Sequence, residues 1–165
     1  MVLKSYTKIN LSLSINSKSR DGLHEIQSLF CLINLSDKIK IYKINKKKDQ
    51  ILFMGAFAKH IKKSDNSIDK LLKLLRRLKL ISGYYSVTIQ KNIPVFGGLG
   101  GGTSNAAFIL KFLLKERITK NILNIIEKLI GSDLRLFFCK QGFLEKLKTV
   151  REVKKKKKLV FLLIY

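Results

Sequence analysis

One glycine-rich segment of the sequence has the composition of a phosphate-binding loop. Five of the ten glycines of the chain fall within positions 97–102, and Thr103 and Ser104 follow directly. Glycine lacks a Cβ, so the backbone there can turn sharply and approach a ligand closely. A helix starting next would add unpaired N–H groups and a positive dipole end, which together bind anions. The segment therefore predicts a phosphate cradle.

A flexible glycine linker is the alternative interpretation of this segment. Linkers are usually mixed with serine and flanked by polar residues. Here the flanks are apolar, since residues 85–90 have a strand pattern and residues 106–114 a helical one. The segment also lacks the Lys-Ser/Thr that closes a Walker loop and the third glycine of a dinucleotide fingerprint. These features indicate a different class of nucleotide-binding protein.

The apolar periodicity predicts an α+β domain around this loop. Residues 6–15 alternate, which predicts a half-buried strand with Ile9, Leu11, Leu13 and Ile15 on one face and Lys8 on the polar face. Strands followed by helices favour a sheet covered by helices. Further strands are predicted at 26–35, 38–44, 51–54 and 159–164, and helices at 68–78, capped by Asn66 or Ser64 and stopped by Gly83, and from Thr119 to Gly131.

Length and composition favour one domain over residues 1–165. The 165 residues are 46% apolar, enough for a core and too apolar for a disordered chain. No apolar run approaches the ~18–20 residues of a membrane span, and the first residues do not have the hydrophobic stretch typical of a signal peptide. Cys31 and Cys139 lack metal-ligand spacing. We therefore expect a cytoplasmic protein with reduced core cysteines and no membrane partner.

The charge balance is strongly basic, with 34 Lys and Arg against 11 Asp and Glu and a net charge of +23. Such a balance is typical of nucleic-acid-binding proteins. Only six of the 34 are arginine, however, and arginine is the better ligand for phosphates and bases. The abundance of Lys, Ile and Asn is what AT-rich codons produce. Codon bias is therefore favoured over a nucleic-acid partner, with a polyanion-binding surface as the alternative.

Residues 94–107 resemble the second motif of the galactokinase–homoserine kinase–mevalonate kinase (GHMP) superfamily. The branch that phosphorylates a cytidine-diphosphate-linked methylerythritol has the same three glycines before Thr/Ser-Ser-Asn-Ala-Ala. Residues 7–11, 21–30 and 131–133 agree in order and spacing, and residues 65–68 fall where that family has a similar run. The resemblance extends from about residue 4 to 145, and residues 146–165 are weakly defined. It implies the nucleotide-binding N-terminal domain of a GHMP kinase, with a ribosomal-protein-like sheet covered by helices.

The resemblance implies ATP-dependent phosphorylation of the 2-hydroxyl of that substrate, a step of non-mevalonate isoprenoid synthesis, with Mg²⁺. By the same resemblance Lys8 and Asp133 are the catalytic pair, with Asp133 accepting the hydroxyl proton and Lys8 stabilising developing charge. The alternative for Lys8 is a solvated surface lysine, and the alternative for Asp133 is a helix cap. Asn10 is expected to hold the substrate, and His24 to contact cytosine.

The nucleotide contacts implied by the resemblance come mainly from the glycine loop. Ser104 is expected to reach Mg²⁺ or a phosphate oxygen. Asn66 and Lys91 match positions at the adenine end of ATP, with a helix cap and a surface lysine as alternatives. The loop residues expected to hold ATP are Pro94, Val95, Phe96, Gly97, Gly98, Leu99, Gly100, Gly101, Gly102, Thr103 and Ser104.

The chain departs from the family pattern at three places. Leu23 replaces an aromatic residue that stacks on cytosine, Leu134-Arg135 replaces Val-Pro, and Tyr6 replaces a proline. The second domain of the family is expected to be absent after Tyr165. We then expect an uncovered interface at Phe137, Phe138 and residues 159–164, through which the chain associates.

Three other functions remain open at this level. One is a kinase of the same superfamily acting on another alcohol, and the second is an inactive remnant of such a kinase. The third is a basic nucleic-acid-binding module, because the first domain of the superfamily shares its fold with a ribosomal-protein domain. Steep loss of affinity with salt would distinguish the nucleic-acid module.

Overall fold

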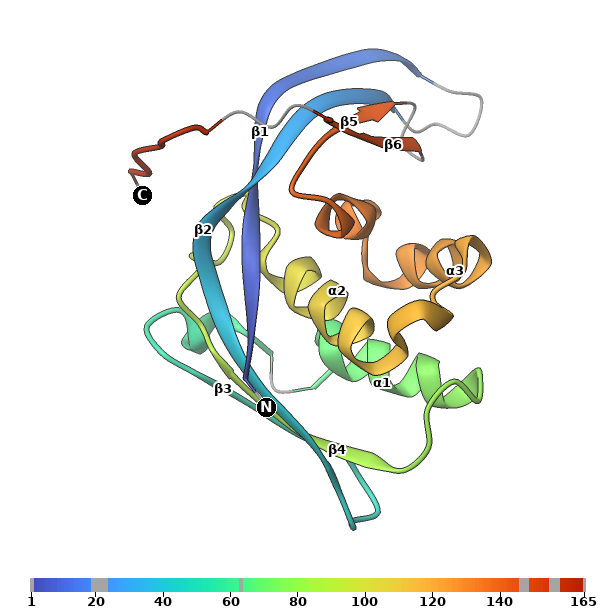
Figure 1. Cartoon of the computed structure of the whole chain (residues 1–165). Coiled ribbons are helices and arrows are strands. Elements are labelled where there is room, and N and C mark those ends of the chain that lie inside the picture. Colours follow the sequence, from blue (N-terminus) through green and yellow to red (C-terminus); the bar gives the residue numbers. More distant parts are fainter. Residues whose placement is uncertain (1, 19–23, 63, 146–148, 155–157, 165) are drawn as a thin grey trace.

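The computed structural model describes residues 2–18, 24–62, 64–145, 149–154 and 158–164, and Figure 1 shows their arrangement. Within these residues, strands form one mixed sheet and helices cover one of its faces, so the predicted α+β architecture is confirmed. The strands are β1 (Val2–Lys18), β2 (His24–Ile44), β3 (Gln50–Met54), β4 (Tyr84–Gln90), β5 (Gln141–Glu145) and β6 (Thr149–Glu152). The helices are α1 (Ser67–Arg77), α2 (Gly101–Leu114) and α3 (Lys120–Ile130), with short 3-10 helices η1 (Ala58–His60), η2 (Lys115–Arg117) and η3 (Ser132–Phe138).

Strand β2 organises the sheet. It pairs antiparallel with β1 along one edge, and with β5 and β4 at successive positions along the other. β3 adds to β4 in parallel, and β6 adds to β5. The separate strands predicted at 26–35 and 38–44 are one continuous strand, because Ser36 and Asp37 between them stay in the β1 pairing. β5 and β6 were not predicted from the sequence.

The core lies between the sheet and the three α-helices. Ile39 and Ile41 of β2, and Val87 and Ile89 of β4, meet apolar side chains of α1, α2 and α3 there. α1 begins at the predicted cap, since the Asn66 side chain accepts hydrogen bonds from N of Ile68 and N of Asp69. Its predicted end at Gly83 is wrong, because the helix stops at Arg77 and Gly83 forms a positive-φ turn before β4. α3 has the predicted cap and stop residues, Thr119 and Gly131.

The alternating face predicted for β1 is wrong in its distal half. Leu11, Leu13 and Ile15 are 38%, 55% and 63% exposed. Nearer the N-terminus, the pairing with β2 slips between Tyr6 and Lys8. A register irregularity re-aims the side chains next to it. Adjacent Thr7 and Lys8 are accordingly both buried, whereas strict alternation would place them on opposite faces.

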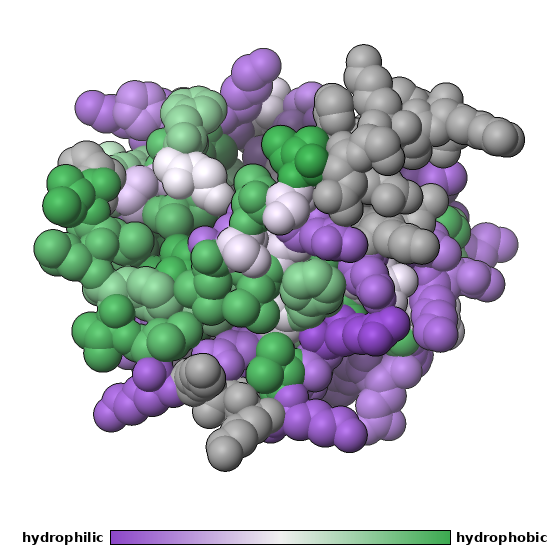
Figure 2. All heavy atoms as spheres, turned by 90° about the horizontal axis from the view of Figure 1, so that it is seen from above, coloured by the Kyte–Doolittle hydropathy of each residue, from purple (hydrophilic) through white to green (hydrophobic). Residues whose placement is uncertain are grey.

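The C-terminal segment does not form the predicted strand. Residues 159–164 pair with no strand among the described residues, and Val160, Leu162 and Ile164 are each more than 85% exposed. Figure 2 shows hydrophobic side chains gathered on one side of the molecule seen from above.

Phe137, predicted at an uncovered interface, is instead fully buried against α2 and η3 neighbours. None of the helices in the described part of the chain is long and apolar enough to span a membrane.

Candidate functional site

The glycine loop connects the end of β4 to the start of α2. Phe96, Gly98 and Gly100 have positive φ angles of 69°, 67° and 68°, so the backbone turns sharply three times. α2 begins at Gly101, five residues before the apolar pattern predicts a helix at Ala106. Glycine has a low helix propensity, but the packing of this helix overrides it, since residues Ser104 to Ala107 are all buried. The loop therefore ends directly in a helix N-terminus.

A cavity of about 520 Å³ lies over this helix N-terminus. Its walls include the loop from Pro94 to Thr103, Asn66 and Ser67 at the start of α1, and Lys91 and Asn105. The remaining lining residues are Phe53, His60, Ile61, Lys62 and Asp65. No side chain caps α2 and no acidic residue occupies its first turn. The first N–H groups of a helix lack intrahelical partners, and with the helix dipole they attract anions. The cavity thus fits a phosphate group.

Two glycines of the cradle leave little room for a side chain. A Cβ on Gly100 would lie 3.0 Å from Cζ of Phe137, and a Cβ on Gly101 would lie 3.1 Å from Cγ2 of Ile93. Gly98 has open space around it but a φ of +67°. Close approach and positive φ, respectively, explain why glycine occupies these positions.

Lys8, Asn10 and Asp133 come together beside the cradle. The Lys8 ammonium lies 3.2 Å from Oδ2 of Asp133 and donates to Oδ1 of Asn10 at 3.3 Å. Cε of Lys8 would lie 3.6 Å from a Cβ on Gly100, so the pair adjoins the loop. Gly131 ends α3 and η3 begins at Ser132, which places Asp133 in the first turn of η3. The helix-cap alternative for Asp133 is wrong, because Thr119 and not Asp133 caps α3, and η3 has no side-chain cap.

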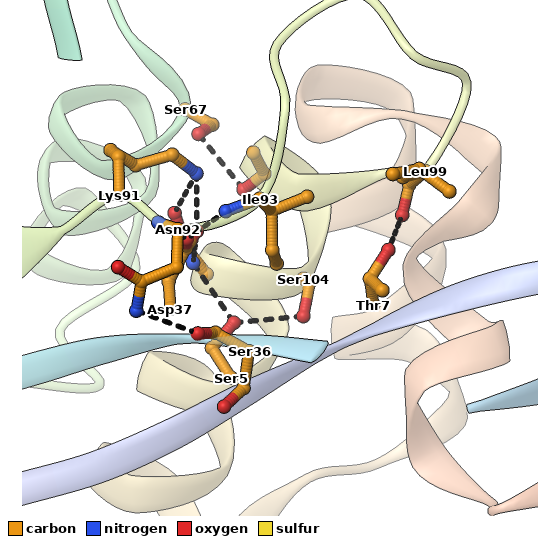
Figure 3. Close-up of polar contacts among 12 residues, drawn as sticks. Ser5, Thr7, Ser36, Asp37, Ser67, Lys91, Asn92, Ile93, Leu99 and Ser104 are labelled. Atoms are coloured by element: carbon orange, nitrogen blue, oxygen red, sulfur yellow. Dashed lines mark hydrogen bonds and ion pairs between the residues drawn. The ribbon is translucent and has the colours of Figure 1, made fainter. Parts of the chain in front are cut away.

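Strand β1 holds the loop from one side. The Thr7 hydroxyl donates to the carbonyl oxygen of Leu99, and N of Lys8 donates to the same oxygen at 3.4 Å. At the other side, the Ser67 hydroxyl donates to O of Gly102 at 3.1 Å (Figure 3). These bonds fix the loop between β1 and α1.

Ser104 does not face the cavity, which corrects its predicted contact with Mg²⁺ or phosphate. The residue is fully buried, and it is not part of the cavity wall. Its hydroxyl donates to O of Tyr6 and lies 2.8 Å from Oγ of Ser5. On a helix, Thr103 and Ser104 point about 100° apart. The buried position of Ser104 leaves Thr103 as the hydroxyl on the cavity side.

The two residues predicted at the adenine end, Asn66 and Lys91, both line the cavity, but their side chains have different bonding partners. Asn66 caps α1 and its Nδ2 donates to O of Lys62 at 3.3 Å, so the cap alternative is confirmed. Lys91 is 2% exposed, which makes the surface-lysine alternative wrong. Its ammonium is ion-paired with Asp37 and donates to Oδ1 of Asn105 at 3.2 Å. The predicted cytosine contact of His24 lies outside the described side chains, although His24 begins β2.

Asp37, Arg135 and Lys111 were missed by the sequence analysis. Asp37 is a charged residue inside an apolar strand pattern, which is the signal that could have revealed it. Arg135 binds Glu127 and Asn124 of α3 through its guanidinium, so it anchors η3 two residues after Asp133.

Among the described residues, no group of three His, Cys, Asp or Glu side chains could hold a metal ion.

Lys111 ties α2 to the end of η3. Its ammonium donates to O of Phe137 and lies 4.7 Å and 4.9 Å from the ring centroids of Phe108 and Phe138. Burial lowers the pKa of the Lys111 ammonium below its usual value, and the opposing influence of Cys139 is smaller. Lys111 therefore fixes Phe137, whose ring lies against Gly100, although burying the charged ammonium is unfavourable.

Comparisons with known proteins agree with this architecture. The family described as GHMP kinases N terminal domain matches residues 66–132. The 4-diphosphocytidyl-2-C-methyl-D-erythritol kinase of Pelagibacter ubique is 41% identical over 138 residues, which are 81% of this chain and 48% of the relative. The chain thus spans about half the length of the curated relatives it matches.

Solved structures give the same fold. A crystal structure of 4-(cytidine 5'-diphospho)-2C-methyl-D-erythritol kinase matches with a TM-score of 0.67 at 22% identity, covering 93% of this chain and 55% of that one. A structure described as MDDEF in complex with MVAPP, AMPPCP and magnesium matches with a TM-score of 0.61 at 16% identity, over 92% of this chain and 50% of that one. Both likenesses concern the fold alone.

Proposed function

Because this chain belongs to the GHMP kinases through its N-terminal domain, we propose that it binds ATP with Mg²⁺ and transfers phosphate to an alcohol. The observation that supports this most directly is the Lys8–Asp133 ion pair beside the glycine cradle. A kinase needs phosphate binding and a proton acceptor at adjacent places. The proposed substrate is 4-diphosphocytidyl-2-C-methyl-D-erythritol, the compound in the name of the 41% identical relative.

The glycine loop and the N-terminus of α2 would hold the phosphates. The tight glycine positions and the uncapped helix start fit a phosphate bound by backbone N–H groups. Mg²⁺, when bound, neutralises charge on the β- and γ-phosphates. Mg²⁺ prefers one or two carboxylates together with phosphate oxygens. Thr103 would offer a hydroxyl to the ion from the cavity wall.

Asp133 would accept the proton of the substrate hydroxyl. Its side chain is 39% exposed, so a substrate can reach it, whereas Lys8 is shielded at 6%. The Lys8 ammonium, 3.2 Å from Oδ2 of Asp133, would stabilise negative charge that develops on the attacking oxygen. Asn10 is exposed and bonded to Lys8, which suits it to orient the alcohol or diphosphate of the substrate.

The test measures ATP·Mg²⁺ binding by calorimetry and ADP formation with the proposed substrate, for the parent, Asp133→Asn and Glu145→Gln. Glu145 makes the same carboxylate-to-amide change possible in a β5–β6 ion pair outside the cavity. We expect the parent and Glu145→Gln to bind ATP and form ADP, and Asp133→Asn to bind ATP without forming ADP. A parent chain that binds no ATP overturns the proposal. A chain that binds ATP but transfers nothing is a nucleotide-binding remnant.

A further inference from the structure

A buried carboxylate lies under the glycine loop at the point where β4 turns into it. Asp37 of β2 is fully buried. Its Oδ1 accepts hydrogen bonds from N of Asn92 at 2.7 Å and N of Ile93 at 2.9 Å. These are the second and third residues after β4 ends at Gln90, and Pro94 follows them. One oxygen of Asp37 thus sets the backbone direction in which the chain leaves the sheet toward the loop.

The other oxygen of Asp37 binds the far end of the loop. Oδ2 accepts from Nδ2 of Asn105 at 2.9 Å and is ion-paired with the Lys91 ammonium (Figure 3). Lys91 also donates to Oδ1 of Asn105 at 3.2 Å. Asn105 lies in the first turns of α2, immediately after the cradle. A single side chain therefore joins the residues on both sides of the glycine loop.

The same network reaches the floor of the cradle. A Cβ on Gly101 would lie 3.3 Å from Nζ of Lys91, so the ammonium held by Asp37 lies directly against the helix start. Asn105 Nδ2 also donates to Oγ of Ser5 at 2.9 Å, which connects the network to β1. Glycine-rich backbone is intrinsically permissive, and a binding site needs such backbone held in one conformation.

We propose that Asp37 is a positioning residue for nucleotide binding, which fixes the two ends of the glycine loop and the Lys91 ammonium beneath Gly101. This inference rests on the proposed function of the cavity. A charge pair this deep is weak evidence for stability alone, since well-packed apolar residues can serve as well there. What an apolar side chain at position 37 would lose is the simultaneous hold on Asn92, Ile93, Lys91 and Asn105.

The chain offers a matched control in Asp49. That carboxylate is also nearly buried, is ion-paired with Arg76 at 2.7 Å, and accepts from N of Tyr85 at 2.8 Å. Tyr85 lies at the start of β4, whereas Asn92 and Ile93 follow its end. Asp37→Asn and Asp49→Asn therefore remove the same charge from two ion pairs at opposite ends of one strand, of which only the Asp37 pair touches the loop. The Asp49 pair is the more exposed of the two, because Arg76 is 25% exposed and Lys91 2%.

The experiment measures thermal unfolding, ATP·Mg²⁺ affinity and amide hydrogen exchange of residues 91–103 in the parent and both variants, below all unfolding transitions. We expect both variants to unfold at lower temperature. Asp37→Asn should also raise the Kd for ATP about tenfold or more and speed exchange in the loop, because misplacing a binding group by a small distance is costly. Asp49→Asn should leave both readouts close to parental values.

Parental affinity and exchange in Asp37→Asn, or the same changes in Asp49→Asn, would overturn the inference. If Asp37→Asn does not fold, Asn92→Ala replaces it, because this variant removes only the 3.0 Å bond from Nδ2 of Asn92 to O of Ser36 on the same segment. It should speed loop exchange and raise the Kd by a smaller factor. A parent that binds no ATP refutes the proposed function, whereas the exchange comparison still decides whether Asp37 positions the loop.

Discussion

Lys8 and Asp133 form an asymmetric ion pair, with 3.2 Å between Nζ and Oδ2 and side-chain exposures of 6% and 39%. The cation is enclosed by β1 and the glycine loop, and the anion faces solvent. A buried partner is screened less than a surface one, so the ammonium acts strongly on a carboxylate that a substrate can still reach. This arrangement leaves the carboxylate accessible to a substrate hydroxyl while the ammonium stays enclosed beside it.

Replacing the exposed partner of this pair should separate chemistry from binding. Asp133→Asn keeps the shape and removes the proton acceptor, so we expect phosphoryl transfer to fall about 100- to 10,000-fold. The Kd for ATP measured by calorimetry should change little. Lys8→Met should lower transfer similarly, and the double variant should lose less than the product of the two losses. Parental turnover in Asp133→Asn would contradict its catalytic role.

The two adjacent glycines at the start of α2 should respond differently to a side chain. Gly101→Val places atoms against Ile93 and the Lys91 ammonium, where a Cβ alone would lie at 3.1 Å and 3.3 Å. We expect ATP binding to be lost. Gly102→Ala meets only Oγ of Ser67, at an ordinary 3.6 Å, and should lose less affinity. Equal affinities for Gly101→Val and the parent would remove the loop from nucleotide binding.

Arg135 should control turnover through η3. Arg135→Leu removes the bonds to Glu127 and Asn124 that anchor η3 to α3. Asp133 would then be less well oriented, and we expect kcat to fall about tenfold with little change in the Kd for ATP. Arg151→Leu breaks the exposed pair with Glu145 and serves as the control. Similar kcat values for the two variants would show that η3 needs no such anchor.

The pH dependence of stability should reveal the buried ammonium of Lys111. Burial lowers its pKa in the folded state from the usual 10.5. The unfolded chain therefore binds more protons between the two pKa values, and stability from this group rises with pH in that interval. Denaturation of the parent and Lys111→Met from about pH 7 to 10 should show the free-energy difference shifting in favour of the parent. The exposed Lys128→Met is the control, and the same shift there would refute the assignment.

Exposed apolar side chains should make the chain associate as salt rises. Leu13, Ile15, Val160 and Leu162 are all more than half exposed. The net charge of +23 opposes association at low ionic strength, and salt screens it. We expect binding of a hydrophobic dye, and sedimentation of larger species at high salt. A dye-silent monomer at both low and high salt would contradict this prediction.

Local patterns were enough to locate the glycine loop and the starts of two of the helices near it. The glycine run, the capped helix after Asn66 and the helix between Thr119 and Gly131 each depend on residues close together in the chain. Such features follow from backbone freedom, capping and helical periodicity, which act within a few residues. The family motif around residues 94–107 extended these local signals to the α+β fold.

Tertiary structure alone decided where individual side chains point. The slipped β1–β2 register buries Lys8, and the contact with β1 turns the Ser104 hydroxyl away from the cavity. A lysine such as Lys91 is expected on the surface. Here it is buried, because Asp37, far away in sequence, pairs with its charge in the core. Partners of this kind are brought together only by the sheet and helix packing, because no periodicity encodes which distant residue satisfies a buried charge.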